Sequence, residues 1–338
     1  HGLAPQPMQN EHPITAEATA GRRERPVVAL VVPCYNEEEM LPVSAPQLLA
    51  LLDGMVAEGI ASADSFILCV DDGSRDGTWE LIGRLHSEDH RLKGITLAHN
   101  RGQQSAMLAG LMTVRPMADA AITIDADLQD SPQAVVEMVR LYRLGYDIVY
   151  GVRASRSSDS FYKRASARAF YKLQNALGLE TIYDHSEFRL MGRRALDILE
   201  EYPERNLFIR GIMTSIGLKW TTVTYDRCAR AAGETKYSFG KLLSLSVDGI
   251  TSFTAKPMRL IFGLGLVLLL LDIVISAWVL ISHFGGNAMS GWASLMLSIW
   301  FLGSIILIAL GIIGEYVGKI FTEVKRRPRY NIAESLMD

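Results

Sequence analysis

Two aspartates separated by one residue follow a short apolar stretch of the chain. The β-branched run Ile122–Ile124 predicts a strand that ends in Asp125-Ala126-Asp127, and alternate residues of a strand point to the same side. Two carboxylates this close repel unless a cation lies between them, and Mg²⁺ suits one or two protein carboxylates completed by substrate phosphates. The motif therefore predicts a divalent-metal site that binds a diphosphate. A solvated turn is the alternative, since about one Asp-x-Asp is expected by chance at this length.

Further apolar runs precede other polar clusters, with helix-like segments between them. This alternation at short spacing indicates a doubly wound, mostly parallel α/β sheet, whose ligands bind beyond the carboxyl ends of the strands. We therefore expect Tyr35-Asn36-Glu37, Asp71-Asp72 and Asp125-Ala126-Asp127 at one edge, although helix capping explains any single cluster equally well. The predicted strands are Val27–Val32, Phe66–Val70, Ile95–Ala98, Ile122–Ile124 and Asp147–Tyr150, and the predicted helices are Pro46–Glu58, Thr78–His86, a segment ending near Val114, and Pro132–Leu144.

Composition and missing motifs exclude several classes of protein. The 338 residues carry a net charge of −3, which argues against a general nucleic-acid binder. No Walker-type Gly-Lys-Ser and no Gly-x-Gly-x-x-Gly follows the first predicted strand, which argues against a P-loop enzyme and a dinucleotide dehydrogenase. Cys34, Cys69 and Cys228 have no metal-like spacing, and the first two are expected to be small core residues. A reducing, cytosolic compartment is the natural inference.

Four motifs, in this order and spacing, resemble a known family. The runs VVPCYNEEE, VDDGSRDGT, NRGQQSAMLAG and IDADLQD resemble the catalytic domain of inverting glycosyltransferase family 2. The later blocks GVRASRSSDSFYKRASARAFY, DHSEFRLM and GETKYSF narrow the resemblance to the polyprenyl-phosphate glycosyltransferases, a group that includes dolichol-phosphate mannose synthase and bactoprenol glucosyltransferase. The match runs from about Val27 to the C-terminus. It implies a GT-A fold, which is Rossmann-like with a mostly parallel sheet, and a nucleotide-sugar donor.

The resemblance implies roles for residues at the predicted edge. By this resemblance Asp125, Asp127 and Gln129 bind Mg²⁺ or Mn²⁺ and through the ion the donor diphosphate, and Asp127 also counts as catalytic. Such a cation neutralises charge on the leaving diphosphate. Asp184 has the position of the catalytic carboxylate. Because a lipid monophosphate is already anionic near pH 7, we expect Asp184 to orient the nucleophile or the sugar rather than to act as a strong base. The residues that would hold the nucleoside are Pro33, Tyr35, Glu37 and Asp72.

Basic residues of the second half are candidates for binding the phosphate of the acceptor. Ser160–Leu177 mixes cations with aromatic residues at helical spacing, which predicts an interfacial helix or an ordinary solvated helix face. The segment Gly233–Tyr237 resembles a mobile acceptor loop of the related family. The resemblance implies a polyprenyl phosphate such as undecaprenyl phosphate as acceptor. The candidates for its phosphate are Arg153, Arg164, Arg230 and Lys236.

Two apolar segments near the C-terminus predict membrane-spanning helices. Leu260–Ile281 and Ala293–Gly314 each contain about 22 residues, enough to cross a bilayer core of about 30 Å, although a buried core hairpin is the alternative. Lys and Arg flank their outer ends and are missing from Ser282–Trp292, so the positive-inside rule places both termini and the catalytic domain on the cytoplasmic side of an inner or plasma membrane. Gly240–Ala255 is a candidate for a second interfacial helix.

The predicted organisation combines these parts. They are a flexible tail (1–25), a GT-A catalytic domain (26–230), an acceptor loop with an interfacial helix (231–257), two transmembrane helices (258–316) and a basic cytoplasmic tail (317–338). The predicted activity is an inverting, metal-dependent transfer of a hexose to polyprenyl phosphate, with UDP-glucose favoured over UDP-GlcNAc or GDP-mannose. The related enzymes also make a homo-oligomer an expectation.

Two other functions remain as alternatives. A processive polysaccharide synthase of the same superfamily would carry a Gln-x-x-Arg-Trp element, which this sequence lacks, and two spans make a poor polymer channel. A non-catalytic membrane scaffold or flippase accessory could keep the same fold. The intact residues Asp125, Asp127, Gln129 and Asp184 argue against such a scaffold.

Overall fold

The computed structural model describes residues 22–153, 185–204, 209–226 and 292–338, together with isolated positions between 261 and 274. The chain divides into two compact units. The first comprises His1–Arg168, Thr181–Lys236 and Pro328–Asp338, and the second comprises Ala169–Glu180 and Tyr237–Arg327. The sheet lies in the first unit, whereas the described part of the second contains helix α11 (Trp292–Lys325).

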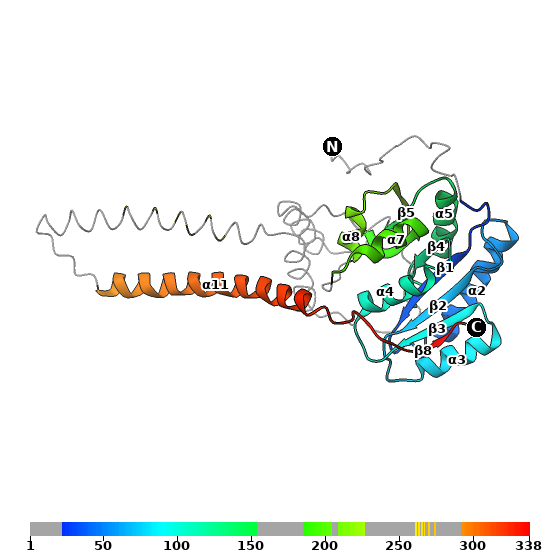
Figure 1. The fold of residues 1–338 in the computed structure, drawn as a ribbon, viewed down its shortest axis with the longest axis horizontal. Coiled ribbons are helices and arrows are strands. Elements are labelled where there is room, and N and C mark those ends of the chain that lie inside the picture. Colours follow the sequence, from blue (N-terminus) through cyan, green and yellow to red (C-terminus); the bar gives the residue numbers. More distant parts are fainter. Residues whose placement is uncertain are drawn as a thin grey trace, which may run out of the picture. The chain divides into compact units, whose positions relative to one another are not determined.

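The first unit is built on a sheet of eight strands (Figure 1). They are β1 (Val28–Cys34), β2 (Phe66–Asp71), β3 (Leu92–Leu97), β4 (Ala120–Thr123), β5 (Ile148–Arg153), β6 (His185–Gly192), β7 (Trp220–Tyr225) and β8 (Ile332–Leu336). Their order is β7-β5-β6-β4-β1-β2-β3-β8. The neighbours β4, β1, β2 and β3 are parallel, whereas β6 is antiparallel to β4 and β5. The predicted parallel sheet is thus confirmed in its central strands.

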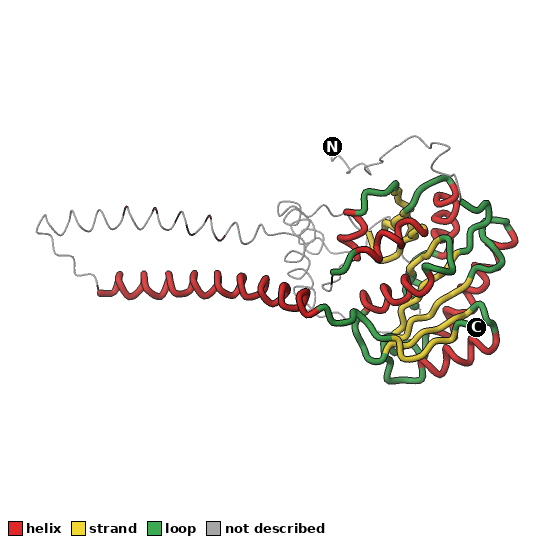
Figure 2. The backbone as a smooth tube through the Cα atoms, in the orientation of Figure 1, coloured by secondary structure: helices red, strands yellow, loops and turns green. Residues whose placement is uncertain are grey.

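Helices cover both faces of the sheet (Figure 2). They are α2 (Leu41–Ala57), α3 (Thr78–Glu88), α4 (Gln103–Val114), α5 (Pro132–Arg143), α7 (Arg193–Glu201) and α8 (Ile209–Ser215). Gly110 of α4 lies against Val31 of β1, while Leu30 shares a buried cluster with Leu48 of α2. Successive strand residues point to opposite faces, so α4 and α2 lie on opposite sides of β1. Because α3 and α5 contact α2 and α7 contacts α4, the predicted doubly wound arrangement is confirmed.

The sequence explains most of these elements locally. Strand β2 reads FILCVD and every residue of it is buried, as expected for a strand covered by helices on both faces. Helix α2 begins at Leu41, earlier than the predicted start at Pro46. Pro42 lies in the first turn, where the missing N–H has no helical partner in any case, so this proline starts the helix and Pro46 lies inside it.

The C-terminal segment differs from the expected basic tail over 317–338. Helix α11 continues to Lys325, and strand β8 pairs antiparallel with β3 at the edge of the sheet. Trp79 donates to a carboxylate oxygen of Glu334 (3.1 Å), and the Lys93 ammonium donates to the carbonyl of Met337 (2.5 Å). Nearly all of β8 is exposed, so its sequence lacks the alternation of apolar and polar residues that reveals a half-buried strand.

Only part of the predicted membrane region falls on described residues. Within α11, the most apolar 18 residues of Phe301–Lys325 have a mean hydropathy of 2.0 and none of them is buried, so by length and composition this segment is a candidate membrane span. It overlaps the predicted span Ala293–Gly314. The predicted span Leu260–Ile281 is described only at isolated positions, and the predicted interfacial helices Ser160–Leu177 and Gly240–Ala255 lie outside the described residues.

Candidate active site

The polar clusters after β1 and β2 lie together at the carboxyl edge of the sheet. The two strands are parallel neighbours, so the loops that follow them meet. The backbone N–H of Asn36 donates to the Ser74 hydroxyl (2.9 Å), and the N–H of Arg75 donates to the side-chain carbonyl of Asn36 (2.9 Å). Thr78, the first residue of α3, accepts from the N–H of Glu37 (2.9 Å). The predicted meeting is therefore confirmed for these two of the three clusters.

Asp72 ties the β2 loop to the β3 loop. Its two carboxylate oxygens accept from the backbone N–H groups of Arg101 (2.7 Å) and Gly102 (2.8 Å), directly before α4 begins. Burial raises the pKa of Asp72, and these two hydrogen bonds oppose the rise. Gly102 has a φ of +87°, which favours glycine. Asp72 therefore has a structural function in addition to the nucleoside contact predicted for it.

The loop after β4 carries the predicted metal ligands. Asp125 and Asp127 are partly exposed, Ala126 between them is 4% exposed, and all three lie beyond the end of β4 at Thr123. Asp127 accepts from the N–H of Gln129 (3.2 Å), which makes a local turn. Leu128 has a φ of +50°, a conformation that costs a residue other than glycine about 1–3 kcal/mol and that is typical of functional loops.

The side chains of this loop fit a hard divalent cation. Asp125, Asp127 and Gln129 supply carboxylate and amide oxygens, they are partly exposed, and they come from one short loop. In the described ranges no three His, Cys, Asp or Glu residues form a group that could hold an ion unaided. Mg²⁺ and Mn²⁺ accept such an incomplete set, because substrate phosphates and water supply the other ligands.

Glu187 is a residue at this site to which the sequence analysis assigned no role. It lies on β6 and forms an ion pair with Arg189, whose side chain is 1% exposed. Gln104 of α4 donates to the Glu187 carboxylate (3.0 Å), and Thr123, at the end of β4, donates to the Glu187 carbonyl. The only sequence signal was its place in the DHSEFRLM block. The structure thus places a further acidic residue, from β6, next to the end of β4.

Some of the other predicted site residues lie in the described ranges, and some lie outside them. Pro33, Tyr35 and Glu37 are partly exposed at the end of β1 and in the loop after it, and their contact with a nucleoside stays a prediction. Arg153 is the last residue of β5, and its side chain is not described. The residues that lie outside the described ranges are Asp184, Arg164, Arg230 and Lys236.

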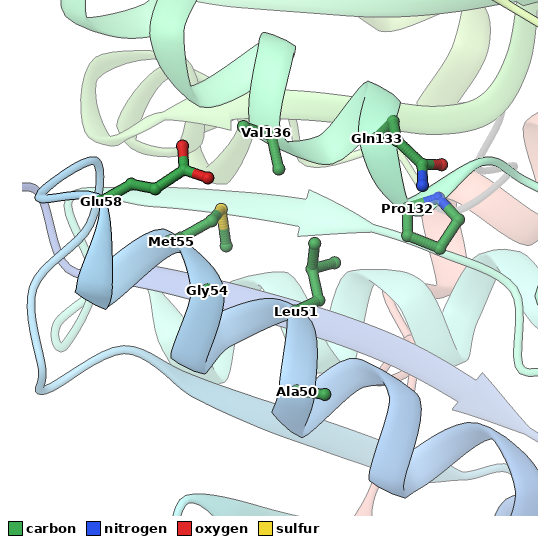
Figure 3. Close-up of a pocket in the computed structure, with 8 residues that line it drawn as sticks. All are labelled: Ala50, Leu51, Gly54, Met55, Glu58, Pro132, Gln133 and Val136. Carbon is green, nitrogen blue, oxygen red and sulfur yellow. The ribbon is translucent and has the colours of Figure 1, made fainter.

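A separate cavity lies between α2 and α5 (Figure 3). Its volume is about 220 Å³, and its lining includes Leu51 and Met55 from α2 and Val136 from α5. None of the predicted site residues lines it. The cavity is a gap between two packed helices, so it adds nothing to the site at the strand ends.

The parallel core, with a pair of carboxylates beyond β4, defines an α/β domain of the kind whose ligands bind at the carboxyl edge of the sheet. A comparison with protein families identifies the family of this domain. Residues 29–199 match the family described as Glycosyl transferase family 2. The chain belongs to this family and is a glycosyltransferase, as its motifs predicted.

Several relatives of the chain have names that agree with this family. It is 48% identical to the uncharacterized glycosyltransferase YkoT of Bacillus subtilis over 92% of each chain. It is 37% identical to the prophage bactoprenol glucosyl transferase homolog of Escherichia coli, over 90% of this chain and 98% of the relative. It is 36% identical to the bactoprenol glucosyl transferase of Shigella phage SfII, over 91% and 98% of the two chains.

A comparison with solved structures matches the chain to the mannosyltransferase PcManGT from Pyrobaculum calidifontis in complex with GDP-Man and Mn²⁺. The identity is 14%, the TM-score is 0.42, and the match covers 89% of this chain and 87% of the other.

Proposed function

We propose that this glycosyltransferase transfers a hexose, with inversion, from a nucleotide diphosphate sugar to the phosphate of a polyprenyl lipid, and that UDP-glucose is the donor. The observation that carries the proposal is the partly exposed pair Asp125 and Asp127 at the edge where the loops after β1 and β2 meet. Relatives named bactoprenol glucosyl transferase, which match over nine tenths of this chain, support a lipid acceptor.

The proposed reaction needs few proton transfers. An oxygen of the lipid phosphate attacks the anomeric carbon and forms the new bond, while the bond from that carbon to the donor diphosphate breaks and the diphosphate leaves with the electron pair. A divalent cation at Asp125, Asp127 and Gln129 would supply positive charge to this leaving group. The attacking phosphate is already ionised near neutral pH, so Asp184 would align the reactants.

Binding of the lipid acceptor is assigned to basic residues and to the apolar C-terminal region. Arg153, Arg164, Arg230 and Lys236 are proposed to bind the lipid phosphate by charge-assisted hydrogen bonds. Helix α11 is proposed as one of two spans of an inner or plasma membrane, with the catalytic unit and both termini on the cytoplasmic side. A homo-oligomer is proposed from the resemblance alone.

The test uses the full chain in detergent with undecaprenyl phosphate, Mg²⁺ or Mn²⁺, and a panel of radiolabelled UDP and GDP sugars. Label from UDP-glucose should enter organic solvent and should be abolished by a chelator. Label from UDP-GlcNAc or GDP-mannose instead would correct the donor, and label in a water-soluble polymer would indicate a polysaccharide synthase. With folded protein and verified lipid, no transfer from any donor would favour a non-catalytic scaffold.

A variant ties the activity to the site. Asp127→Ala should abolish transfer while the protein remains folded, because the change removes an oxygen ligand from a partly exposed loop. Full turnover by this variant would refute the metal assignment.

A further inference from the structure

The loop from Asp125 to Asp130 is held at both ends by side chains from distant parts of the sequence. Gln103, the first residue of α4, donates from its amide to Asp125 (3.0 Å). Tyr225, the last residue of β7, donates from its hydroxyl to Asp130 (2.5 Å). We propose that Gln103 and Tyr225 are positioning residues that hold this loop in the conformation that binds a divalent cation with a nucleoside diphosphate. The proposal rests on the proposed function.

The Tyr225 side of the loop is rigidly built. Tyr225 and Asp130 are each 4% exposed, so their hydrogen bond is shielded from water and involves an ionisable acceptor, which makes it one of the stronger kinds. The Tyr225 ring packs edge-to-face on Phe188 with centroids 5.2 Å apart. A β-carbon at Gly151 would come within 2.6 Å of the Phe188 ring and 3.0 Å of the Tyr225 ring. Gly151 therefore leaves the space that this aromatic pair occupies.

The Gln103 side is fixed through the start of α4. The two backbone N–H groups immediately before Gln103 donate to the buried carboxylate of Asp72. Farther along α4, Gly110 allows close contact with β1 and β2. The amide of Gln103 is therefore presented to Asp125 from a helix whose position is already determined by the sheet.

The conformation between the two ends explains why such support is needed. Leu128 has a φ of +50°, which is unfavourable for a residue with a branched side chain. A strained conformation of this kind persists only where the surrounding structure imposes it. Asp127 and Gln129 flank Leu128, so loss of either anchor should let the ligand oxygens move away from one common point.

The test compares two tyrosine-to-phenylalanine variants of the full chain. Tyr225→Phe removes only the hydroxyl that reaches Asp130. Tyr142→Phe is the matched control, because it removes a hydroxyl that donates to the carbonyl of Asp119 (3.0 Å), before β4 begins. Calorimetric titration measures Mn²⁺ binding in the presence of UDP and, separately, of GDP. This measurement does not depend on turnover.

We expect Tyr225→Phe to weaken Mn²⁺ binding about tenfold in the presence of the nucleotide that binds, the scale of one hydrogen bond to a charged group, while Tyr142→Phe binds as the unmodified protein does. In the transfer assay the KM for the metal should rise more than kcat falls. Gln103→Ala should act in the same direction.

Separate outcomes identify which idea fails. Unchanged Mn²⁺ affinity in Tyr225→Phe, or an equal loss in Tyr142→Phe, would refute the positioning function while transfer by the unmodified protein upholds the proposed activity. If the unmodified, folded protein binds Mn²⁺ with neither nucleotide and transfers no sugar, both proposals are refuted.

Discussion

Replacing Gly110 by alanine should destabilise the catalytic unit, whereas the same change at Gly54 should stabilise it. Both glycines lie inside helices, Gly110 in α4 and Gly54 in α2. Alanine is favoured over glycine in a helix by about 1 kcal/mol, so propensity predicts the same gain at both sites. The two positions differ in what a new β-carbon would meet, since Gly110 is buried and Gly54 is exposed.

The contacts set the expected magnitude. At Gly110 the β-carbon would lie 2.4 Å from a methyl of Val31 and 2.8 Å from a methyl of Val70, and both valines are fully buried. Valine is stiff at χ1 and cannot swing away, so the overpacking cost should approach the upper end of about 1–3 kcal/mol. Subtracting the helical gain leaves a net loss of about 2 kcal/mol. At Gly54 nothing lies within 4 Å, so the full gain remains.

Thermal unfolding of the full chain in detergent, followed by tryptophan fluorescence, measures the difference. A gap of about 3 kcal/mol between the two variants corresponds to about 6–12 °C for a unit of this size, with the unmodified protein between them. A Gly110→Ala variant that melts at or above the unmodified protein would refute the packing argument. A destabilised Gly54→Ala variant would show that propensity is not the governing effect at that helix.

Three further changes test other parts of the molecule. Burial raises the pKa of Asp72, so the folded chain keeps the proton of this carboxyl group to higher pH than the unfolded chain does. The stability that the protonated group contributes is therefore lost as the pH rises from about 4 through the raised pKa. Asp72→Asn should remove this pH dependence from the melting temperature. If the melting temperatures of the variant and of the unmodified protein change in parallel with pH, the prediction is contradicted. Arg153→Ala should raise the KM for the lipid with donor binding nearly unchanged, and equal loss of both in steady-state kinetics would exclude its acceptor role. Deleting residues 332–338 should expose the edge of β3 and cause aggregation during size-exclusion chromatography, and a monodisperse product would argue against edge protection by β8.

The central fold and the convergence of polar loops could be predicted from the sequence, because each depends on local patterns. Continuous apolar runs such as Phe66–Val70 indicate strands buried on both faces, and parallel neighbours must end at one edge. Strand β6 could not be predicted in this way. It reads HSEFRLMG, in which three polar residues are followed by Phe188 and the buried charge of Arg189. Its antiparallel place between β4 and β5 depends on the order of strands in space.

The same limit applies to the site. Asp125 and Asp127 could be identified because two aspartates at this spacing, directly after an apolar run, predict a metal site. Glu187 and Tyr225 could not, since their contacts join β6 to α4 and β7 to the loop after β4, which are distant in the sequence. No sequence pattern predicts the hydrogen-bond partner of a tyrosine at the end of a strand. Such residues become visible only when the strand order is known.

One chain of contacts links the two halves of the proposed donor site. Asp72, predicted to bind the nucleoside, accepts the two N–H groups that lead into α4, and α4 begins with Gln103, which donates to Asp125 of the predicted metal loop. A carboxylate can accept about four hydrogen bonds, so Asp72 can support this loop and still accept a bond from a nucleoside. Because the link runs through the two residues directly before Gln103, a change at Asp72 should disturb the position of Gln103 and with it the diphosphate end of the site. Nucleoside and metal binding are therefore expected to depend on the same few hydrogen bonds.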